Sequence, residues 1–150
     1  MKIGYFLSCE EHGPADLIAQ ARAAEAAGFH GLWISDHFHP WIDAQGHSPF
    51  VWSTIGAIAQ VTERVTVTTG VTCPTVRIHP AIIAQAAATA AAMMPGRFFL
   101  GVGTGENLNE HVLGDDWPDT DVRQEMLEEA VAVANVQPSW DGGDTADRRT

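Results

Sequence analysis

The segment of residues 35–41 brings together an aspartate and two histidines, with Asp36 directly before His37 and His39 close behind. Histidine is the side chain whose proton affinity suits acid–base chemistry near neutral pH, and a neighbouring carboxylate can orient or tune it. A lone histidine in a loop more often only bonds to backbone, but Asp36, two histidines and Trp41 in one short segment favour a functional site. His37 is the best candidate for a general base.

A glycine-rich segment at residues 101–111 contains a second candidate, Glu106. Glycines let the backbone approach a planar or phosphorylated ligand, and a carboxyl group in such a pocket can keep its proton and act as an acid. A dinucleotide-binding fingerprint is the rival interpretation. It fits poorly, because Glu106 stands where that fingerprint needs glycine or alanine, and no helix is expected to start at once. Taken alone, the segment is equally consistent with a tight turn.

The elements that must position these residues follow a pattern that occurs four times: a short apolar run, a loop and a helical segment. Runs rich in aromatic or β-branched residues predict strands at residues 2–7, 31–35, 65–69 and 98–102. Prolines at 14, 49 and 80 predict helix starts, and the four expected helices cover about 14–27, 49–61, 80–94 and 121–135. Strands that alternate with helices pair in parallel, so the fold class is α/β.

Long loops follow two of the strands, at residues 36–48 and 103–120, whereas the returns from helix to strand are short. A barrel with its site at the carboxyl ends of the strands has this distribution. The segment 68–75 ends the third strand at the same rim. We expect a TIM-barrel type (β/α) fold with about four βα units, a half-barrel or truncated barrel, over residues 1–135. Residues 136–150 are expected to form a divergent, disordered tail.

The composition of the chain argues against several classes of binding partner and indicates where the protein works. The net charge of −11, from 8 Lys and Arg against 19 Asp and Glu, disfavours nucleic acid and anionic membranes. The first residues lack the apolar core of a signal peptide and no stretch approaches the length of a membrane span, so we expect a cytoplasmic protein. The only cysteines, Cys9 and Cys73, are expected to be free thiols.

Five stretches, in order along the chain, resemble the luciferase-like flavin and deazaflavin oxidoreductases, and most closely the branch of the F420-dependent glucose-6-phosphate dehydrogenases. They lie at residues 2–14, 35–41, 46–53, 69–89 and 96–111. The resemblance implies a TIM barrel that binds coenzyme F420 rather than FMN. It also implies hydride transfer between a carbinol carbon of a small-molecule substrate and the deazaflavin, with a sugar phosphate such as glucose 6-phosphate as one candidate substrate.

The resemblance also assigns roles to single residues. His37 corresponds to the base that removes the hydroxyl proton of the substrate, and Glu106 to the acid that protonates the deazaflavin ring. Trp41 and Glu10 correspond to groups on the substrate side. The coenzyme-binding positions that the resemblance implies are Asp36, Gly70, Val71, Thr104, Gly105 and Asn109. In the family, the bond that corresponds to Gly70–Val71 is a cis peptide behind the coenzyme ring.

Two other classes of function stay open. A metal-dependent hydrolase could use His37 and His39 together with Glu10, His12 and Glu106, whereas the dehydrogenase needs no metal. A non-catalytic half-barrel would act only in association. The family closes eight βα units in roughly 250 residues, and a four-stranded parallel sheet leaves two open edges and one uncovered apolar face. We therefore expect a homo-oligomer or a complementing chain, and no robust activity from this chain alone.

Overall fold

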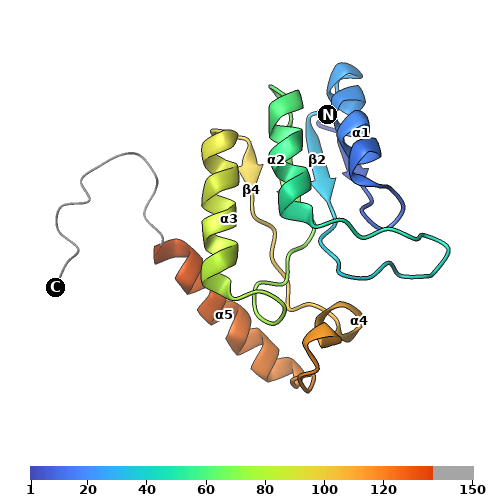
Figure 1. Cartoon of the computed structure of the whole chain (residues 1–150). Helices are drawn as coiled ribbons and strands as arrows, with labels where there is room; N and C mark the ends of the chain where they lie inside the picture. The colour runs from blue at the N-terminus through green and yellow to red at the C-terminus, as the bar shows by residue number, and fades with distance from the viewer. Residues whose placement is uncertain (137–150) are drawn as a thin grey trace.

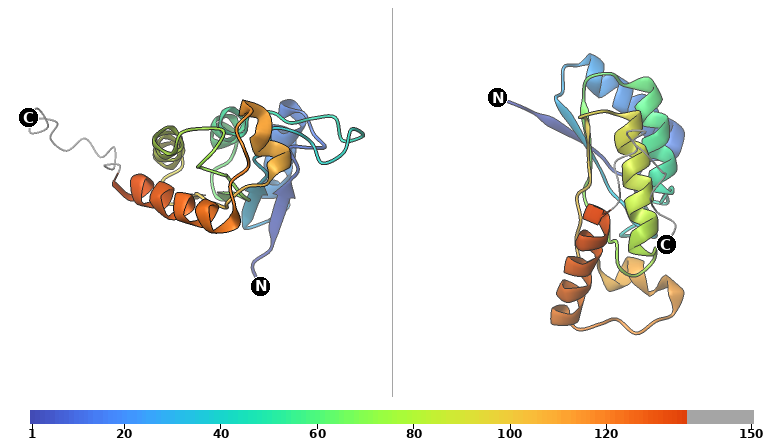
Figure 2. Two further views of the ribbon diagram at one scale, coloured as in Figure 1. Left: turned by 90° about the horizontal axis from the view of Figure 1, so that it is seen from below. Right: turned by 90° about the vertical axis from the view of Figure 1, so that its left-hand side faces the viewer.

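Four parallel strands in sequence order form the sheet: β1 (Gly4–Leu7), β2 (Gly31–Ile34), β3 (Thr66–Thr69) and β4 (Phe98–Phe99). The structure, a computed structural model, describes residues 1–136. Helices α1 (Pro14–Ala26), α2 (Val51–Val61) and α3 (Pro80–Met93) connect successive strands and lie together on one face of the sheet (Figures 1 and 2). The predicted α/β class and its parallel connections are confirmed.

Local sequence signals explain where the first and third helices begin and end. Pro14 and Pro80 occupy first-turn positions, where a missing N–H costs nothing. The His79 side chain caps α3 by accepting a hydrogen bond from the backbone N–H of Ala81 at 3.1 Å. Gly28 follows α1 with a positive φ of 88°. The second helix starts two residues later than predicted, because Phe50 rather than a residue before Pro49 is its N-cap.

The fourth strand is shorter than the predicted range 98–102. Only Phe98 and Phe99 pair with β3, and a single bridge joins Thr72 to Val102 further on. Between these two points the Thr69 hydroxyl replaces the regular backbone hydrogen bonds of a parallel strand pair. It donates to the Gly101 carbonyl at 2.8 Å and accepts from the Gly101 N–H at 3.0 Å. A side chain thus satisfies the backbone groups that a longer strand would have paired.

The predicted loop 103–120 contains two short helical segments, so the expectation of an unstructured connection was wrong. They are α4 (Asn107–Glu110) and the 3-10 turn η1 (His111–Leu113). A one-turn helix has too few residues for an apolar periodicity, and α4 is instead held by contacts of its buried residues. Helix α5 (Thr120–Val136) follows within one residue of its predicted bounds and packs against α3. The tail predicted from residue 136 lies, from 137 on, outside the described residues.

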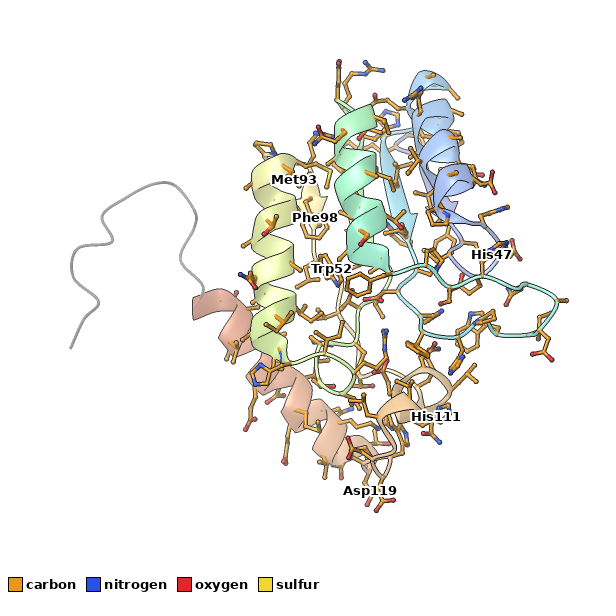
Figure 3. All side chains as sticks on the ribbon, viewed as in Figure 1. His47, Trp52, Met93, Phe98, His111 and Asp119 are labelled. Carbon is orange, nitrogen blue, oxygen red and sulfur yellow. The ribbon has the colours of Figure 1, made fainter. Side chains whose placement is uncertain are left out.

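The core lies between the sheet and its three helices. Alternate strand residues point into it, as Leu7, Leu32 and Val67 do, and α1 and α2 supply further apolar side chains. Trp52 of α2 and Phe98 of β4 pack with ring centroids 6.1 Å apart (Figure 3). Both cysteines are buried and free, as expected, and burial raises the pKa of Cys9 to about 12. None of the described helices is long and apolar enough to cross a membrane.

The opposite face of the sheet is apolar and exposed. Phe6 pairs with Trp33 in register, and Phe99 stands opposite Thr68 on the same row. Phe6, Trp33 and Phe99 are exposed to 49%, 60% and 53%. We call these three side chains the aromatic face; it is the uncovered apolar surface that the sequence predicts.

Candidate active site

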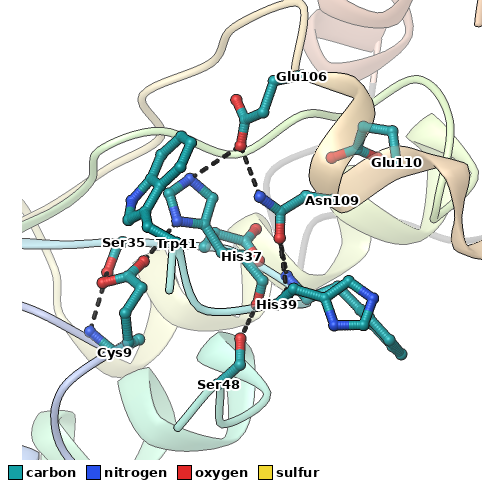
Figure 4. A network of polar contacts seen from close by, with 12 residues as sticks. Cys9, Ser35, His37, His39, Trp41, Ser48, Glu106, Asn109 and Glu110 are labelled. Carbon is teal, nitrogen blue, oxygen red and sulfur yellow. Dashed lines mark hydrogen bonds and ion pairs between the residues drawn. The ribbon is translucent and has the colours of Figure 1, made fainter. Parts of the chain in front are cut away.

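Side chains from three loops meet at the carboxyl ends of the strands (Figure 4). Glu10 follows β1, His37 follows β2, and Glu106 follows β4 just before α4. The His37 Nε2 atom lies 3.2 Å from a carboxylate oxygen of Glu106. His37 and Glu106, which both follow predicted strands, thus lie at one rim, where the predicted fold places its site. Parallel strands account for it, since their carboxyl ends lie on the same edge of the sheet.

His37 is held between two carboxylates. Its Nδ1 atom is 2.5 Å from Glu10 Oε1, and its Nε2 atom faces Glu106 on the other side. The imidazole is mostly buried, with 14% of its side chain exposed. Burial alone would lower the pKa of His37, but the hydrogen bond and charge of Glu10, together with the charge of Glu106, raise it overall.

Glu10 forms the buried base of this arrangement, with only 3% of its side chain exposed. Its second carboxylate oxygen accepts hydrogen bonds from the hydroxyls of Ser8 at 2.9 Å and Ser35 at 2.8 Å. Burial by itself would raise the pKa of Glu10, but the bonds from His37, from its own backbone and from the two serines lower it to about 2. Glu10 therefore carries a fixed negative charge that orients the imidazole; a direct contact with substrate stays a prediction.

The two serines are site residues that sequence reasoning missed. Ser35 belongs to the segment 35–41 but had no assigned role there. Its oxygen also accepts the backbone N–H of Cys9 at 2.9 Å, so it joins the loops after β1 and β2. A small hydroxyl residue directly after a strand and directly before Asp36 is the signal that could have identified it.

Trp41 borders His37 on the open side. The two rings meet edge to face with centroids 4.9 Å apart, and the indole is exposed. The Ser48 hydroxyl donates to the His37 carbonyl at 2.5 Å and ties the end of the loop back to its start. A contact of Trp41 with substrate stays a prediction.

Asp36 faces away from this centre, into a buried ion cluster. One of its carboxylate oxygens accepts the Thr72 hydroxyl at 2.8 Å, and the other lies 3.3 Å from Arg77. Arg77 Nε also binds Glu110 of α4 at 3.1 Å. Burial would lower the pKa of Arg77, but Asp36 and Glu110 raise it. Arg77, which was not among the candidates from the sequence, joins the loops after β2, β3 and β4.

The glycine-rich segment owes its glycines to packing within the protein. A Cβ at Gly101 would lie 2.1 Å from the Thr69 carbonyl oxygen, and a Cβ at Gly103 would lie 2.8 Å from a Val71 methyl carbon. Gly105 has a φ of +75° and lies against the Cys73 sulfur. These contacts explain the composition without a ligand, so the coenzyme-binding roles of Thr104 and Gly105 stay predictions. The expectation that no helix starts at once was also wrong, since the short helix α4 begins directly after Glu106.

The remaining coenzyme positions lie at the same rim. Gly70–Val71 is a cis peptide bond, as the resemblance implied, and the Val71 side chain is exposed. The Thr104 hydroxyl accepts a hydrogen bond from Arg123 at 3.3 Å. Asn109 is completely buried beside Glu106.

Of the residues named for a metal-dependent hydrolase, Glu10, His37 and Glu106 lie together, but both ring nitrogens of His37 face a carboxylate and His39 lies elsewhere. The His39 ring stacks on His111, with centroids 5.8 Å apart, instead of joining His37. Across residues 1–136 no three His, Cys, Asp or Glu side chains are grouped so that they could hold a metal ion. The structure therefore offers no support for this alternative.

Comparison with known proteins gives consistent matches. Residues 1–144 match the model of the luciferase-like monooxygenase family. The F420-dependent glucose-6-phosphate dehydrogenase of Beutenbergia cavernae is 44% identical over 142 residues, which cover 95% of this chain and 42% of that protein. The F420-dependent hydroxymycolic acid dehydrogenase of Mycobacterium tuberculosis is 44% identical over 140 residues, which cover 93% and 38%.

A solved structure is similar as well. An F420-dependent secondary alcohol dehydrogenase in complex with an F420-acetone adduct superposes with a TM-score of 0.86 at 45% identity, over 89% of this chain and 41% of that one. The chain spans about two fifths of the length of these three proteins.

Proposed function

Since this chain belongs to the luciferase-like monooxygenase family, we propose that it carries the acid–base residues of an F420-dependent oxidoreductase. The reaction is hydride transfer between a carbinol carbon of the substrate and the deazaflavin. The observation that carries the proposal is the imidazole of His37, fixed by buried Glu10 and in contact with Glu106 at the strand ends. The three similar proteins are F420-dependent dehydrogenases by name, which supports the coenzyme and the reaction class.

The groups at this rim suit a deazaflavin. When bound, such a coenzyme supplies the two-electron chemistry without a metal or a protein nucleophile. Val71 offers an exposed apolar surface to a flat ring, and 39% of the Glu106 side chain is exposed beside it on the same rim. Gly70, Val71, Thr104 and Gly105 are the residues proposed to hold the ring. Asp36 supports the segment that contains Gly70 and Val71 through its buried contacts with Thr72 and Arg77.

The arginines near the rim are already engaged. Arg77 is paired with Asp36 and Glu110, and Arg123 lies 4.6 Å over the Trp117 ring while it binds Thr104. The anionic groups of the coenzyme would therefore gain little from either side chain. We expect this chain alone to bind F420 weakly, because the described residues provide mainly the redox end of the site.

His37 acts as the base in this proposal. With Nδ1–H donated to Glu10, the neutral ring presents Nε2 as an acceptor for the hydroxyl proton of the substrate. The imidazolium that forms is stabilised by Glu10 on one side and Glu106 on the other. Because Glu106 touches the same nitrogen and is partly exposed, it can take the proton on and serve as the acid toward the coenzyme ring.

The substrate is a carbinol compound that contacts Trp41 as it approaches His37. The similar proteins act, by their names, on glucose 6-phosphate, a hydroxymycolic acid and a secondary alcohol, all of which carry hydroxyl groups on carbon. A sugar phosphate is one candidate within that class. The described part of the site offers the substrate one exposed indole and one imidazole. These groups select for a hydroxyl-bearing carbon more than for the other parts of the substrate molecule.

Titration of the purified chain with coenzyme F420, followed by the fluorescence of the coenzyme, tests the proposal. Saturable binding, together with loss of the oxidised coenzyme when isopropanol or glucose 6-phosphate is added, would support it. Preference for FMN over F420 would overturn the coenzyme assignment. Binding of neither coenzyme, even at concentrations far above those that saturate a full-length F420-dependent dehydrogenase, would favour the non-catalytic alternative, and zinc-stimulated ester hydrolysis would favour the metal-dependent hydrolase.

A further inference from the structure

We infer that Asn109 is a positioning residue that holds Glu106 against His37. Its catalytic meaning rests on the function proposed above, but its geometric claim concerns this chain alone.

The amide of Asn109 makes three hydrogen bonds within the protein. Its oxygen accepts hydrogen bonds from the backbone N–H groups of Phe38 and His39, both at 2.7 Å. Its nitrogen donates to Glu106 Oε1 at 2.7 Å (Figure 4). Only the amide oxygen can accept from two N–H groups, so these partners fix the orientation of the amide. The side chain is also completely buried.

The two sides of Asn109 join the two halves of the acid–base pair. Phe38 and His39 directly follow His37, so their N–H groups fix the backbone that carries the imidazole. The Glu106 oxygen that accepts from Asn109 is the same oxygen that faces His37 Nε2 at 3.2 Å. Asn109 therefore connects the backbone that follows His37, the base, to the carboxylate of Glu106, the acid. In this way it sets the distance between the two side chains.

Glu106 needs such a restraint. Its side chain is partly exposed, and the contacts of its carboxylate are those with His37 and Asn109. Without the amide donor, the carboxylate can rotate toward water, where its hydration competes with a single contact to His37. Loss of Asn109 should then remove one of the charges that raise the pKa of His37, and that pKa should fall.

Helix α4 does not depend on Asn109 alone. The neighbouring Glu110 is buried and binds the Nε of Arg77 at 3.1 Å and 3.2 Å and its backbone N–H at 3.3 Å. Arg77 in turn contacts Asp36. This second attachment keeps α4 in place when the Asn109 amide is removed, so the effect of a substitution should be confined to Glu106 and the loop after His37.

Histidine titration by NMR on the full chain tests the inference, with no coenzyme or substrate present. The His37 ring signal is assigned by its loss in His37→Gln. Four chains are then compared: the parent, Asn109→Ala, Glu106→Gln and the double variant. Asn107→Ala is the matched control, because Asn107 is an exposed residue of the same type on the same helix.

We expect Asn109→Ala and Glu106→Gln each to lower the pKa of His37, and the double variant to lower it no further than Glu106→Gln alone. Asn107→Ala should leave it unchanged. An unchanged His37 pKa in Asn109→Ala, or an equal decrease with and without Glu106, would overturn the inference, since a purely structural role is additive. If Asn109→Ala does not fold, Asn109→Ser takes its place, because it keeps a polar group in the buried space while its hydroxyl, at the position of the asparagine Cγ, is too short to make the bond to Glu106.

This readout separates the two proposals. A coupled decrease in a chain that never reduces F420 would leave Asn109 as a positioning residue and remove the proposed reaction. If the chain reduces F420 but the effects of Asn109→Ala and Glu106→Gln on the pKa of His37 are independent, the proposed reaction stands and the positioning role of Asn109 is refuted.

Discussion

The buried contact between Glu10 and His37 makes stability depend on pH in a defined window. The pKa of Glu10 is lowered from 4.5 to about 2, so its contribution is present above pH 4.5 and lost as pH falls through about 2. The pKa of His37 is raised above 6.5, so its contribution is present below 6.5 and lost as pH rises through the raised value. The contact therefore stabilises the chain most between about pH 4.5 and 6.5.

Glu10→Gln removes the charge and keeps the size of the side chain. The lowered pKa of Glu10 corresponds to roughly 3 kcal/mol near pH 5.5 and to about 1 kcal/mol near pH 3. The free energy is counted once, because the same contact also raises the pKa of His37. The loss of stability caused by Glu10→Gln should thus shrink by about 2 kcal/mol from pH 5.5 to pH 3.

Urea unfolding followed by tryptophan fluorescence, at several pH values in this range, measures that difference. Glu11→Gln is the matched control, since Glu11 is the exposed neighbour, and it should change stability little at any pH. A loss in Glu10→Gln that stays constant from pH 5.5 to pH 3 would mean that the side chain acts through packing and hydrogen bonds to the serines, and the electrostatic reasoning would be refuted.

Three further predictions follow from the site and the sheet. In a complete barrel context, His37→Ala should lower turnover by at least about 10²-fold with nearly unchanged coenzyme affinity, measured by steady-state kinetics and F420 fluorescence; an equal loss of both would make His37 structural. Light scattering should show association of the chain through the aromatic face, abolished by Trp33→Lys but not by the equally exposed control Ile42→Lys; a monodisperse parent monomer would contradict this. Gly105→Ala should cost about 2 kcal/mol or more in urea unfolding and Gly28→Ala only about 1, since both have positive φ but only Gly105 is crowded; equal costs would show that crowding is unimportant.

The regular part of the fold could be predicted from the sequence because each element has a local cause. Apolar runs predicted the four strands, and prolines at helix starts placed α1 and α3 to within a residue. Helix α4 had no such signal. It exists because Glu110 and Asn109 are bound by residues far away in sequence, and tertiary contacts of this kind leave no periodicity to detect.

The site was predictable in its members more than in their roles. His37 and Glu106 follow strands of one parallel sheet, so topology alone brings them to one rim. Asp36 and Asn109 are polar residues next to them, and the sequence could not show that their polar atoms are turned inward to Arg77 and to backbone N–H groups. Direction of a side chain within a loop depends on its partners, which only the folded chain reveals.

The two attachments of α4 also fix the length of the chain around it. Asn109 and Glu110 are adjacent, and on a helix adjacent side chains point about 100° apart. One reaches the loop after His37 and the other reaches Arg77. Inserting or deleting a single residue before them would rotate both off their partners at once. Engineering of the candidate active site should therefore keep the segment of residues 101–110 at constant length. Insertions and deletions belong in the exposed loop around Ile42, which follows Trp41.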